Sequence, residues 1–500
     1  MNTTTALMLL TISFICIILL LVYTIILLKN NHQIKKYYKR RIQEITNNWA
    51  GGLNQKNKIN SDDRNVFLFW VGKDYKLISI LRNLIYLHST NGKGYKVHLI
   101  NDQNLNDYIN YIPDFFDRME PAHKADYIRV NVVCEYGGIW LDSDTLVMDS
   151  MDSLFDLIET KNGFFIKETN INLCNGVFGS KKKTQLMLEW KNQIDDVLDS
   201  KEDKLEWTDI GSSILKNMNP ILYDDYEIFN GLENLYPVDP TFCVDEYINK
   251  PYDNYKNIIR EYQPLLILVN SIYKKMEENQ DILESKLPIN YFINKSFQNM
   301  KLIDYDFIEI GTSDFDTFIQ KADDKTVGIS VDAVKYYIDN LPDKRNVKKM
   351  NIGISDVNST LNVYYIPPDL ISHNNLPEWF RGCNSINNYH PLHIKYGVEH
   401  LCKIDSVEVI TIQQLFYSNN VRSVKFLKID TEGHDCIILK SLFFYIKYLP
   451  DAFYPLKILF ESNDNTKTED VDEIVKIYTT LGYKLSKRDH DTLLIYDNNI

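Results

Sequence analysis

Residues 135–148 read EYGGIWLDSDTLVM, and this stretch decides how the first half of the chain folds. Its paired glycines end the helix pattern before them, because glycine readily takes the backbone conformation that stops a helix. The apolar run 139–141 then predicts a short buried strand. Since side chains alternate along a strand, Asp142 and Asp144 are expected to point the same way from its end. Two neighbouring carboxylates repel unless a cation lies between them, so the pair indicates a divalent metal site.

A helix pattern, PAHKADYIRVNVVCEY, occupies residues 121–136 just before that strand. Asp126 and Arg129 stand three residues apart and therefore share one face of the helix. On an exposed helix such an ion pair contributes little to stability. Ahead of a metal site it has a second interpretation, in which Asp126 accepts hydrogen bonds from sugar hydroxyls and Arg129 contacts sugar or phosphate.

The order D-x-x-R, paired glycines and D-x-D in ADYIRVNVVCEYGGIWLDSDT (125–145) resembles the sugar-binding DxD region of glycosyltransferases, including capsular-polysaccharide and initiating mannosyl transferases. The resemblance covers residues 62–245. It implies a GT-A-like fold, Mn²⁺ or Mg²⁺ at Asp142 and Asp144, and a nucleotide-diphosphate sugar donor. It also implies transfer of a hexose with retention at the anomeric carbon. The ion would neutralise charge on the leaving diphosphate.

The same resemblance implies three further donor-binding positions. FLFWVG (67–72) is similar to the family's first strand, which lies near the nucleotide base and makes Trp70 a stacking residue. LCNGVFGS (173–180) is similar to a later strand near the sugar and points to Asn175. WTDIGSSIL (207–215) falls where the family has a T-G-P turn, which points to Gly211 although serine follows it here.

Two other interpretations of the acid pair stay open. DSDTLV (142–147) also fits the start of haloacid-dehalogenase-type phosphatases, with the first Asp as nucleophile and the second as general acid. That interpretation expects the motif directly after the first strand of the domain. In the other, the acids only cap a helix that begins near Ser150.

A second α/β block begins with FIEIGTSDFDT (307–317), in which Glu309 and Gly311 end an apolar strand. Glycine at that point lets the backbone approach a ligand closely. The next strand, TVGISVDAV (326–334), ends at Asp332, and an acid there suits ribose hydroxyls.

The specific signal in this block is VKFLKIDTEGHDCIILKS (424–441), which resembles the K-I-D-x-E-G signature of FkbM-type S-adenosylmethionine-dependent methyltransferases. The resemblance covers residues 303–497. It implies a Rossmann-like domain that binds S-adenosylmethionine through Glu309, Gly311 and Asp332. Glu309 stands where the family usually has Asp. A nicotinamide cofactor is disfavoured, because its G-x-G-x-x-G motif is absent.

An O-methyl transfer needs a base for the acceptor hydroxyl, held in line with the sulfonium methyl group. Asp430 and Glu432 are the candidates for this base. The alternative is that both acids cap the helix that follows, where they would bind free backbone N–H groups.

The composition limits the remaining classes. The chain has 500 residues, 44% of them hydrophobic, which suffices for two or three domains with their own cores. A net charge of −13 without a basic, aromatic-rich block argues against nucleic-acid binding. Seven scattered cysteines with no C-x-x-C pair indicate neither a zinc site nor a disulfide framework.

The N-terminal segment 6–28 is apolar and uncharged, and about 20 such residues span a bilayer. We therefore expect a single transmembrane helix there, followed by a polar stalk at 29–60. The alternative is a cleaved signal peptide, although no basic residue precedes the stretch. The basic residues that follow the span place the rest of the chain in the cytosol by the positive-inside rule.

Together these patterns predict an α/β protein with a membrane helix, a GT-A-like domain at 61–300 and a Rossmann-like methyltransferase domain at 301–500. We expect two activities. The first is metal-dependent, retaining transfer of a hexose from a nucleotide-diphosphate sugar. The second is O-methylation of a glycan or glycoconjugate acceptor, dependent on S-adenosylmethionine. The alternative from another class is an inactive, membrane-tethered binding module.

Overall fold

The computed structural model describes residues 59–73, 75–114, 116–167, 173–200, 205–206, 209–230, 263–268, 288–386, 388–463 and 465–497. Contacts divide the chain into two compact units. The first holds the described residues up to Gly72 together with Lys96–Asp142 and Leu154–Gly231. The second holds Lys73–Tyr95, Ser143–Ser153 and the remainder of the chain. The boundary near residue 300 stays a prediction.

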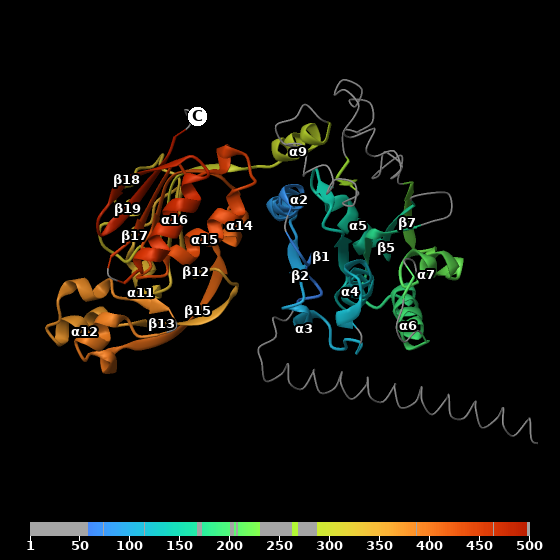
Figure 1. The fold of residues 1–500 in the computed structure, drawn as a ribbon, viewed down its shortest axis with the longest axis horizontal. Coiled ribbons are helices and arrows are strands. Elements are labelled where there is room, and N and C mark those ends of the chain that lie inside the picture. Colours follow the sequence, from blue (N-terminus) through green and yellow to red (C-terminus); the bar gives the residue numbers. More distant parts are fainter. Residues whose placement is uncertain are drawn as a thin grey trace, which may run out of the picture. The chain divides into compact units, whose positions relative to one another are not determined.

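The first unit is built on a six-stranded sheet in the order β2-β1-β3-β6-β5-β7 (Figure 1). The strands are β1 (Asn65–Phe69), β2 (Lys96–Ile100), β3 (Gly138–Leu141), β5 (Gly163–Lys167), β6 (Leu173–Ser180) and β7 (Tyr226–Asn230). β1 is parallel to both β2 and β3, and β6 is antiparallel to β3 and β5. The carboxyl ends of β1 and β3 therefore meet at one edge of the sheet.

Helices of the first unit cover this sheet and complete its core. They are α3 (Leu105–Tyr108), α4 (Pro121–Tyr136), α6 (Gln185–Ser200) and α7 (Ser212–Asn217). α4 begins with proline in its first turn and ends at Gly137, whose φ of 72° is open to glycine at little cost. Its residues from His123 to Cys134, except the partly buried Ala125, are buried on all sides of the helix. Burial all round explains why polar residues of α4 can reach the interior.

The second unit contains a seven-stranded sheet in the order β11-β10-β9-β16-β17-β19-β18 (Figure 1). Its strands are β9 (Ile303–Ile310), β10 (Gly328–Asp332), β11 (Val347–Asn351), β16 (Val421–Ile429), β17 (Lys457–Glu461), β18 (Tyr483–Arg488) and β19 (Asp491–Tyr496). The first five are parallel, and β19 and β18 are antiparallel. The strand order reverses between β9 and β16, which is where sheets of this type bind ligands.

A smaller sheet, β12-β15-β13-β14, is inserted between β11 and the helix that precedes β16. Its strands are β12 (Gly353–Ser355), β13 (Ser359–Tyr365), β14 (Ser385–Ile386) and β15 (Lys403–Thr411), with α12 (Pro368–His373) and α13 (Pro391–Lys395) between them. The remaining helices around the large sheet are α10 (Phe318–Lys321), α11 (Lys335–Asn340), α14 (Ile412–Ser418), α15 (Asp435–Ile446) and α16 (Thr468–Thr479). The second unit also contains α2 (Lys76–Leu87), β4 (Thr145–Val147), β8 (Leu265–Ile267) and α9 (Pro288–Gln298).

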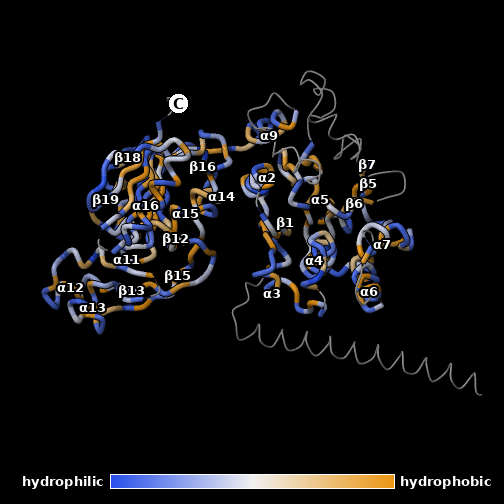
Figure 2. The backbone as a smooth tube through the Cα atoms, viewed as in Figure 1, coloured by the Kyte–Doolittle hydropathy of each residue, from blue (hydrophilic) through white to orange (hydrophobic). Residues whose placement is uncertain are grey.

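Hydrophobic residues concentrate in the strands of both large sheets, as Figure 2 shows. The edge strand β18 is less buried, because five of its six side chains are exposed. Charged residues on an edge strand discourage pairing with other chains.

The expected membrane helix and membrane location have to be corrected. No helix in the part of the chain that the structure describes is long and apolar enough to cross a bilayer. The segments for which the span and the stalk were predicted, 6–28 and nearly all of 29–60, lie outside the described residues.

Candidate active sites

Asp142 follows β3 directly and is held by two donors from the first unit. The indole Nε1 of Trp140 donates to Asp142 Oδ1 at 2.8 Å, and Arg129 donates to the same oxygen at 3.1 Å. The other oxygen, Oδ2, faces Gly176, where a Cβ atom would lie only 2.6 Å away. The Asp142 side chain is 36% exposed. One carboxylate oxygen is therefore fixed, and the other is open to a ligand.

Arg129 bridges the helix acid and the strand acid. Its guanidinium lies 3.4 Å from Asp126 Oδ1 and 3.1 Å from Asp142 Oδ1, and its side chain is only 5% exposed. It also lies over the Trp140 ring, 5.3 Å from the ring centroid. The pair predicted on α4 is thus a buried network, and the interpretation as an exposed ion pair is wrong.

Asp126 is buried and tied to a second predicted residue. Asn175 donates to Asp126 Oδ1 at 2.8 Å. Burial raises the pKa of Asp126 to about 6, against the opposing effect of Arg129. A Cβ atom on Gly211 would come within 2.7 Å of Asn175 Nδ2 and 3.0 Å of Asp126 Oδ2, so a side chain at this position would displace one of these two groups. Five of the predicted donor-site residues therefore lie together: Asp126, Arg129, Asp142, Asn175 and Gly211.

Trp70 and Asp144 occupy different surroundings. Trp70 follows β1 and is half-buried at the edge where β1 and β3 both end, and its backbone N–H donates to Ile100 at 3.1 Å. Asp144 is half-buried and directly precedes β4 in the second unit, and its carbonyl accepts from Leu268 at 3.2 Å. Trp140 and Gly176 were not predicted as site residues. The two-residue spacing of Trp140 and Asp142 was the available signal, because it puts both on one strand face.

The alternatives for the acid pair fit less well. The phosphatase interpretation expects the motif after the first strand, whereas Asp142 follows the third strand in the chain. The capping interpretation fails for Asp142, because its carboxylate contacts Trp140 and Arg129. The next helix, α5 (Asp152–Thr160), begins only ten residues later.

The second unit contains a cavity of about 500 Å³ at the carboxyl ends of β9, β10, β16 and β17. It lies at the topological switch point of the sheet, where a ligand is expected. The predicted residues that line it are Gly311, Asp332, Asp430 and Glu432.

Gly311 and Asp332 shape the wall next to β9 and β10. Gly311 has a φ of 78°, and a Cβ atom there would lie 1.8 Å from the carbonyl oxygen of Asp430. Asp332 accepts from the backbone N–H groups of Ser313 at 2.8 Å and Val334 at 2.7 Å. Burial raises the pKa of Asp332 to about 6. Each Asp332 oxygen keeps a lone pair for a further donor, such as a ribose hydroxyl.

Glu309 is fully buried behind this wall. It accepts from the backbone N–H of Phe318 at 3.0 Å and from Lys428 Nζ at 3.3 Å. Lys428 Nζ also lies 3.4 Å from Asp430. Glu309 does not line the cavity, so it supports the strand ends from behind.

Asp430, Glu432 and Glu461 form a carboxylate cluster whose closest oxygens all lie within 4.8 Å of one another. Burial first, and the neighbouring acids second, raise the pKa values of Glu432 and Glu461 well above their usual range. We assign no metal to this cluster, since shared protons account for acids held this close. The predicted alternative of helix caps is not observed: α15 has no side-chain cap, and Asp435 binds the N–H groups of Thr431 and Glu461.

Glu432 is held by two residues that the sequence analysis missed. His390 Nε2 and Asn465 Nδ2 each lie 3.0 Å from Glu432 Oε2. Glu432 itself has a φ of 53°, which is unfavourable for a residue with a side chain. His390 and Asn465 stand 42 and 33 residues away along the chain, so no local pattern could reveal them.

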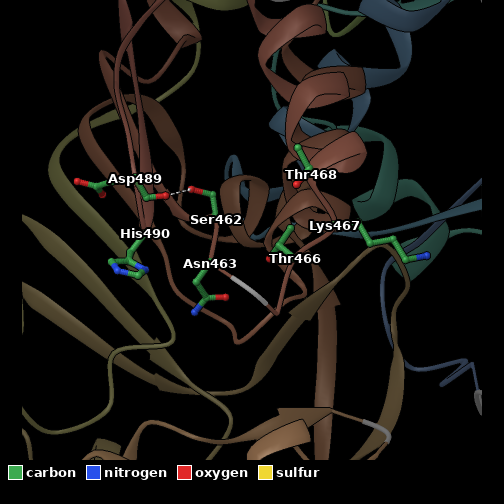
Figure 3. A pocket seen from close by; sticks show the side chains of 7 residues that line it. All are labelled: Ser462, Asn463, Thr466, Lys467, Thr468, Asp489 and His490. Carbon is green, nitrogen blue, oxygen red and sulfur yellow. Dashed lines mark hydrogen bonds between the residues drawn. The ribbon is translucent and has the colours of Figure 1, made fainter.

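A second, open depression of about 510 Å³ lies where β17 ends and α16 begins (Figure 3). Its lining is polar throughout and consists of Ser462, Asn463, Thr466, Lys467, Thr468, Asp489 and His490. Asn463 Nδ2 donates to Glu461, which connects this depression to the carboxylate cluster.

Two family models define the class of protein, an enzyme that combines two group-transfer domains. Residues 23–205 match the family model described as capsular polysaccharide synthesis protein. Residues 308–485 match the family model described as methyltransferase FkbM domain. Both resemblances seen in the sequence are thereby confirmed. The chain is a glycosyltransferase with a methyltransferase domain of the FkbM type, and it modifies glycans.

Two solved glycosyltransferases are similar over part of the chain. The apo-form glycosyltransferase GlyE of Streptococcus pneumoniae TIGR4 is 14% identical, with 58% of this chain and 80% of that chain covered at a TM-score of 0.27. The PaToxG glycosyltransferase is 15% identical, with 38% and 79% covered at a TM-score of 0.23. Scores this low carry no argument about function. No curated protein matches the sequence.

Proposed function

We propose that the glycosyltransferase domain transfers a hexose from a nucleotide-diphosphate sugar with retention, and that the FkbM-type domain methylates a hydroxyl of a glycan with S-adenosylmethionine. The observation that carries the first part is the buried network in which Arg129 joins Asp126 to Asp142. Such a network fixes carboxylates and amides where sugar hydroxyls would bind, so that the donor is oriented before reaction.

In this proposal Asp142 and Asp144, two residues apart in the chain, hold Mn²⁺ or Mg²⁺. The open Oδ2 of Asp142 suits a hard cation. When bound, the ion would neutralise charge on the departing diphosphate. Asp126 and Asn175 bind the sugar, Gly211 leaves room for it, and Trp70 stacks on the base. Burial raises the pKa of Asp142, and Arg129 opposes this rise and orients the carboxylate.

For methyl transfer, Gly311 and Asp332 bind S-adenosylmethionine, which supplies the methyl group, and Glu309 supports the strand ends. Glu432 is the proposed general base: its raised pKa makes the ionised carboxylate a stronger acceptor of a hydroxyl proton. Asp430 is the second candidate for the base. The polar depression beside Glu461 offers hydroxyl, amide and charged groups for a glycan acceptor.

Donor turnover tests the first half of the proposal. The full chain is incubated with Mn²⁺ and a panel of nucleotide sugars, and released nucleoside diphosphate is measured beside the Asp144→Asn variant. We expect release from one donor, lost in the variant. Phosphate release from a generic phosphomonoester, without any donor turnover, would favour the phosphatase instead. Absence of both nucleoside diphosphate release and phosphate release would favour the inactive binding module.

A further inference from the structure

His390 belongs to the small inserted sheet region, immediately before α13, and is fully buried. Its Nδ1 accepts a hydrogen bond from the backbone N–H of Leu392 at 3.2 Å. Burial lowers the pKa of His390 to about 4, so the ring is neutral at physiological pH. A neutral imidazole has one acceptor nitrogen and one N–H. With Nδ1 accepting, the proton is on Nε2.

That Nε2–H points at Glu432 Oε2, 3.0 Å away. Asn465 Nδ2 donates to the same oxygen at 3.0 Å. Both donors therefore hold one oxygen of the carboxylate. The other oxygen, Oε1, lies on the side of Gly382, 3.6 Å from where a Cβ atom would be, and both Gly382 and Glu432 line the cavity.

Glu432 needs such support because of its backbone and its neighbours. Its φ of 53° is disfavoured, and strained residues persist only where surrounding contacts hold them. The charged or titratable groups that face it are Asp430, Asp435, Glu461, Cys383 and His390, with Lys428 paired to Asp430. Several of these are acids that oppose ionisation of Glu432, whereas a neutral N–H donor favours it.

We propose that His390 is a positioning residue of the methyltransferase: it fixes Glu432 Oε2 through a neutral Nε2–H, so that Oε1 faces the acceptor hydroxyl. The inference rests on the proposed role of Glu432 as the general base. It gives the inserted region a part in catalysis, since the region supplies a contact that no strand of the large sheet provides.

His390→Phe removes the donor and keeps a buried ring, whereas His390→Gln offers an amide N–H near the position of Nε2. His393→Phe is the matched control. His393 lies in α13, three residues after His390, and is equally buried. Its ring centroid is 5.6 Å from that of His390, and its Nδ1 lies 3.2 Å from Cys402 Sγ. Methyl transfer from S-adenosylmethionine to a glycan panel is followed against pH, with S-adenosylmethionine binding measured by calorimetry.

For His390→Phe we expect a loss of about 10- to 100-fold in kcat, the size of one hydrogen bond to a carboxylate, with unchanged S-adenosylmethionine affinity. The acidic limb of the pH profile should move to higher pH, because Glu432 loses a donor that favours its charge. His390→Gln should recover part of both effects, and His393→Phe should show neither. Equal losses of kcat in His390→Phe and His393→Phe would overturn the inference. So would an acidic limb of the pH profile that does not move in His390→Phe.

A readout without turnover separates this inference from the proposed function. Histidine-selective ¹⁵N labelling of the full chain reports the ring tautomer, and the His390 signal is identified by its absence in His390→Gln. An Nε2–H tautomer with no ring protonation down to about pH 5 supports the hydrogen bond even where no acceptor is methylated. An Nδ1–H tautomer overturns it even where methyl transfer is active.

Discussion

Trp140 and Asp142 lie on the same face of β3, and the indole Nε1 of Trp140 donates to Asp142 Oδ1 at 2.8 Å. This bond fixes one oxygen of the first acid of the D-x-D motif and leaves Oδ2 beside Gly176. The carboxylate is therefore oriented before any ligand arrives. Trp140→Phe should lower sugar-donor turnover about 10-fold, the effect of one hydrogen bond to a charged group.

The control for this substitution is Trp190→Phe. Trp190 is fully buried in the same core and has no hydrogen bond from its indole N–H to any described residue. Released nucleoside diphosphate is measured for both variants at equal folded fraction. Equal loss in the two would mean that packing, and not the bond to Asp142, matters.

Asp126 gives the first unit a defined dependence of stability on pH. Its pKa is raised from 3.8 to about 6, mainly by burial. A raised carboxyl pKa contributes stability that is complete below the unfolded pKa and is lost as pH rises through the folded pKa. The loss amounts to about 3 kcal/mol between about pH 4 and about pH 7. Asp126→Asn should flatten this part of the profile, and urea unfolding at both pH values measures it. An unchanged slope would contradict the assignment.

The two activities should separate on metal removal. The glycosyltransferase proposal requires a divalent ion at Asp142 and Asp144, whereas the cluster of Asp430, Glu432 and Glu461 is interpreted as metal-free. EDTA should abolish release of nucleoside diphosphate and leave methyl transfer unchanged, and Mn²⁺ should restore the first activity. Methyl transfer that is lost with EDTA and restored by a divalent ion would show that the carboxylate cluster binds metal.

Asp430 and Glu432 can be distinguished as the base by the effect of each on the pH profile. The negative charge of Asp430 raises the pKa of Glu432 after the larger effect of burial. If Glu432 is the base, Asp430→Asn keeps measurable methyl transfer, and its acidic limb moves to lower pH. Glu432→Gln then loses about 100-fold or more in kcat, a typical contribution of general-base catalysis. Loss of methyl transfer in Asp430→Asn, but not in Glu432→Gln, would identify Asp430 as the base.

Gly311 should tolerate no side chain. A Cβ atom there would lie 1.8 Å from the carbonyl oxygen of Asp430, and φ is 78°. Gly311→Ala should therefore abolish S-adenosylmethionine binding measured by calorimetry. Gly397→Ala is the matched control, because Gly397 has a φ of 66° with nothing within 4 Å of its Cβ position. It should lose only about 1–2 kcal/mol of stability and bind normally.

The parts of the two sites that follow from strand and helix periodicity could be predicted from the sequence. One such part is the helix face that Asp126 and Arg129 share. Another is the edge of parallel strand ends where Gly311, Asp332 and Asp430 meet. The contacts of His390 and Asn465 could not be predicted, since they depend on how an inserted sheet region folds. The left-handed backbone of Glu432 leaves no trace in residue type, because glutamate rarely adopts it.

The apolar stretch 6–28 satisfies the length rule for a membrane helix but lies outside the described residues. Within the described ranges, no helix could cross a bilayer. Tertiary evidence was needed on α4, where a charge pair that is usually exposed proved to be buried.

The most direct test of the central claim is mass analysis of a glycan acceptor panel incubated with the full chain, Mn²⁺, a nucleotide sugar and S-adenosylmethionine. The account predicts an acceptor that gains one hexose, lost in Asp144→Asn, and a glycan that gains one methyl group, lost in Glu432→Gln. Each variant should keep the activity of the other domain. An acceptor panel that gains neither group, while phosphate is released from phosphomonoesters, would contradict the account.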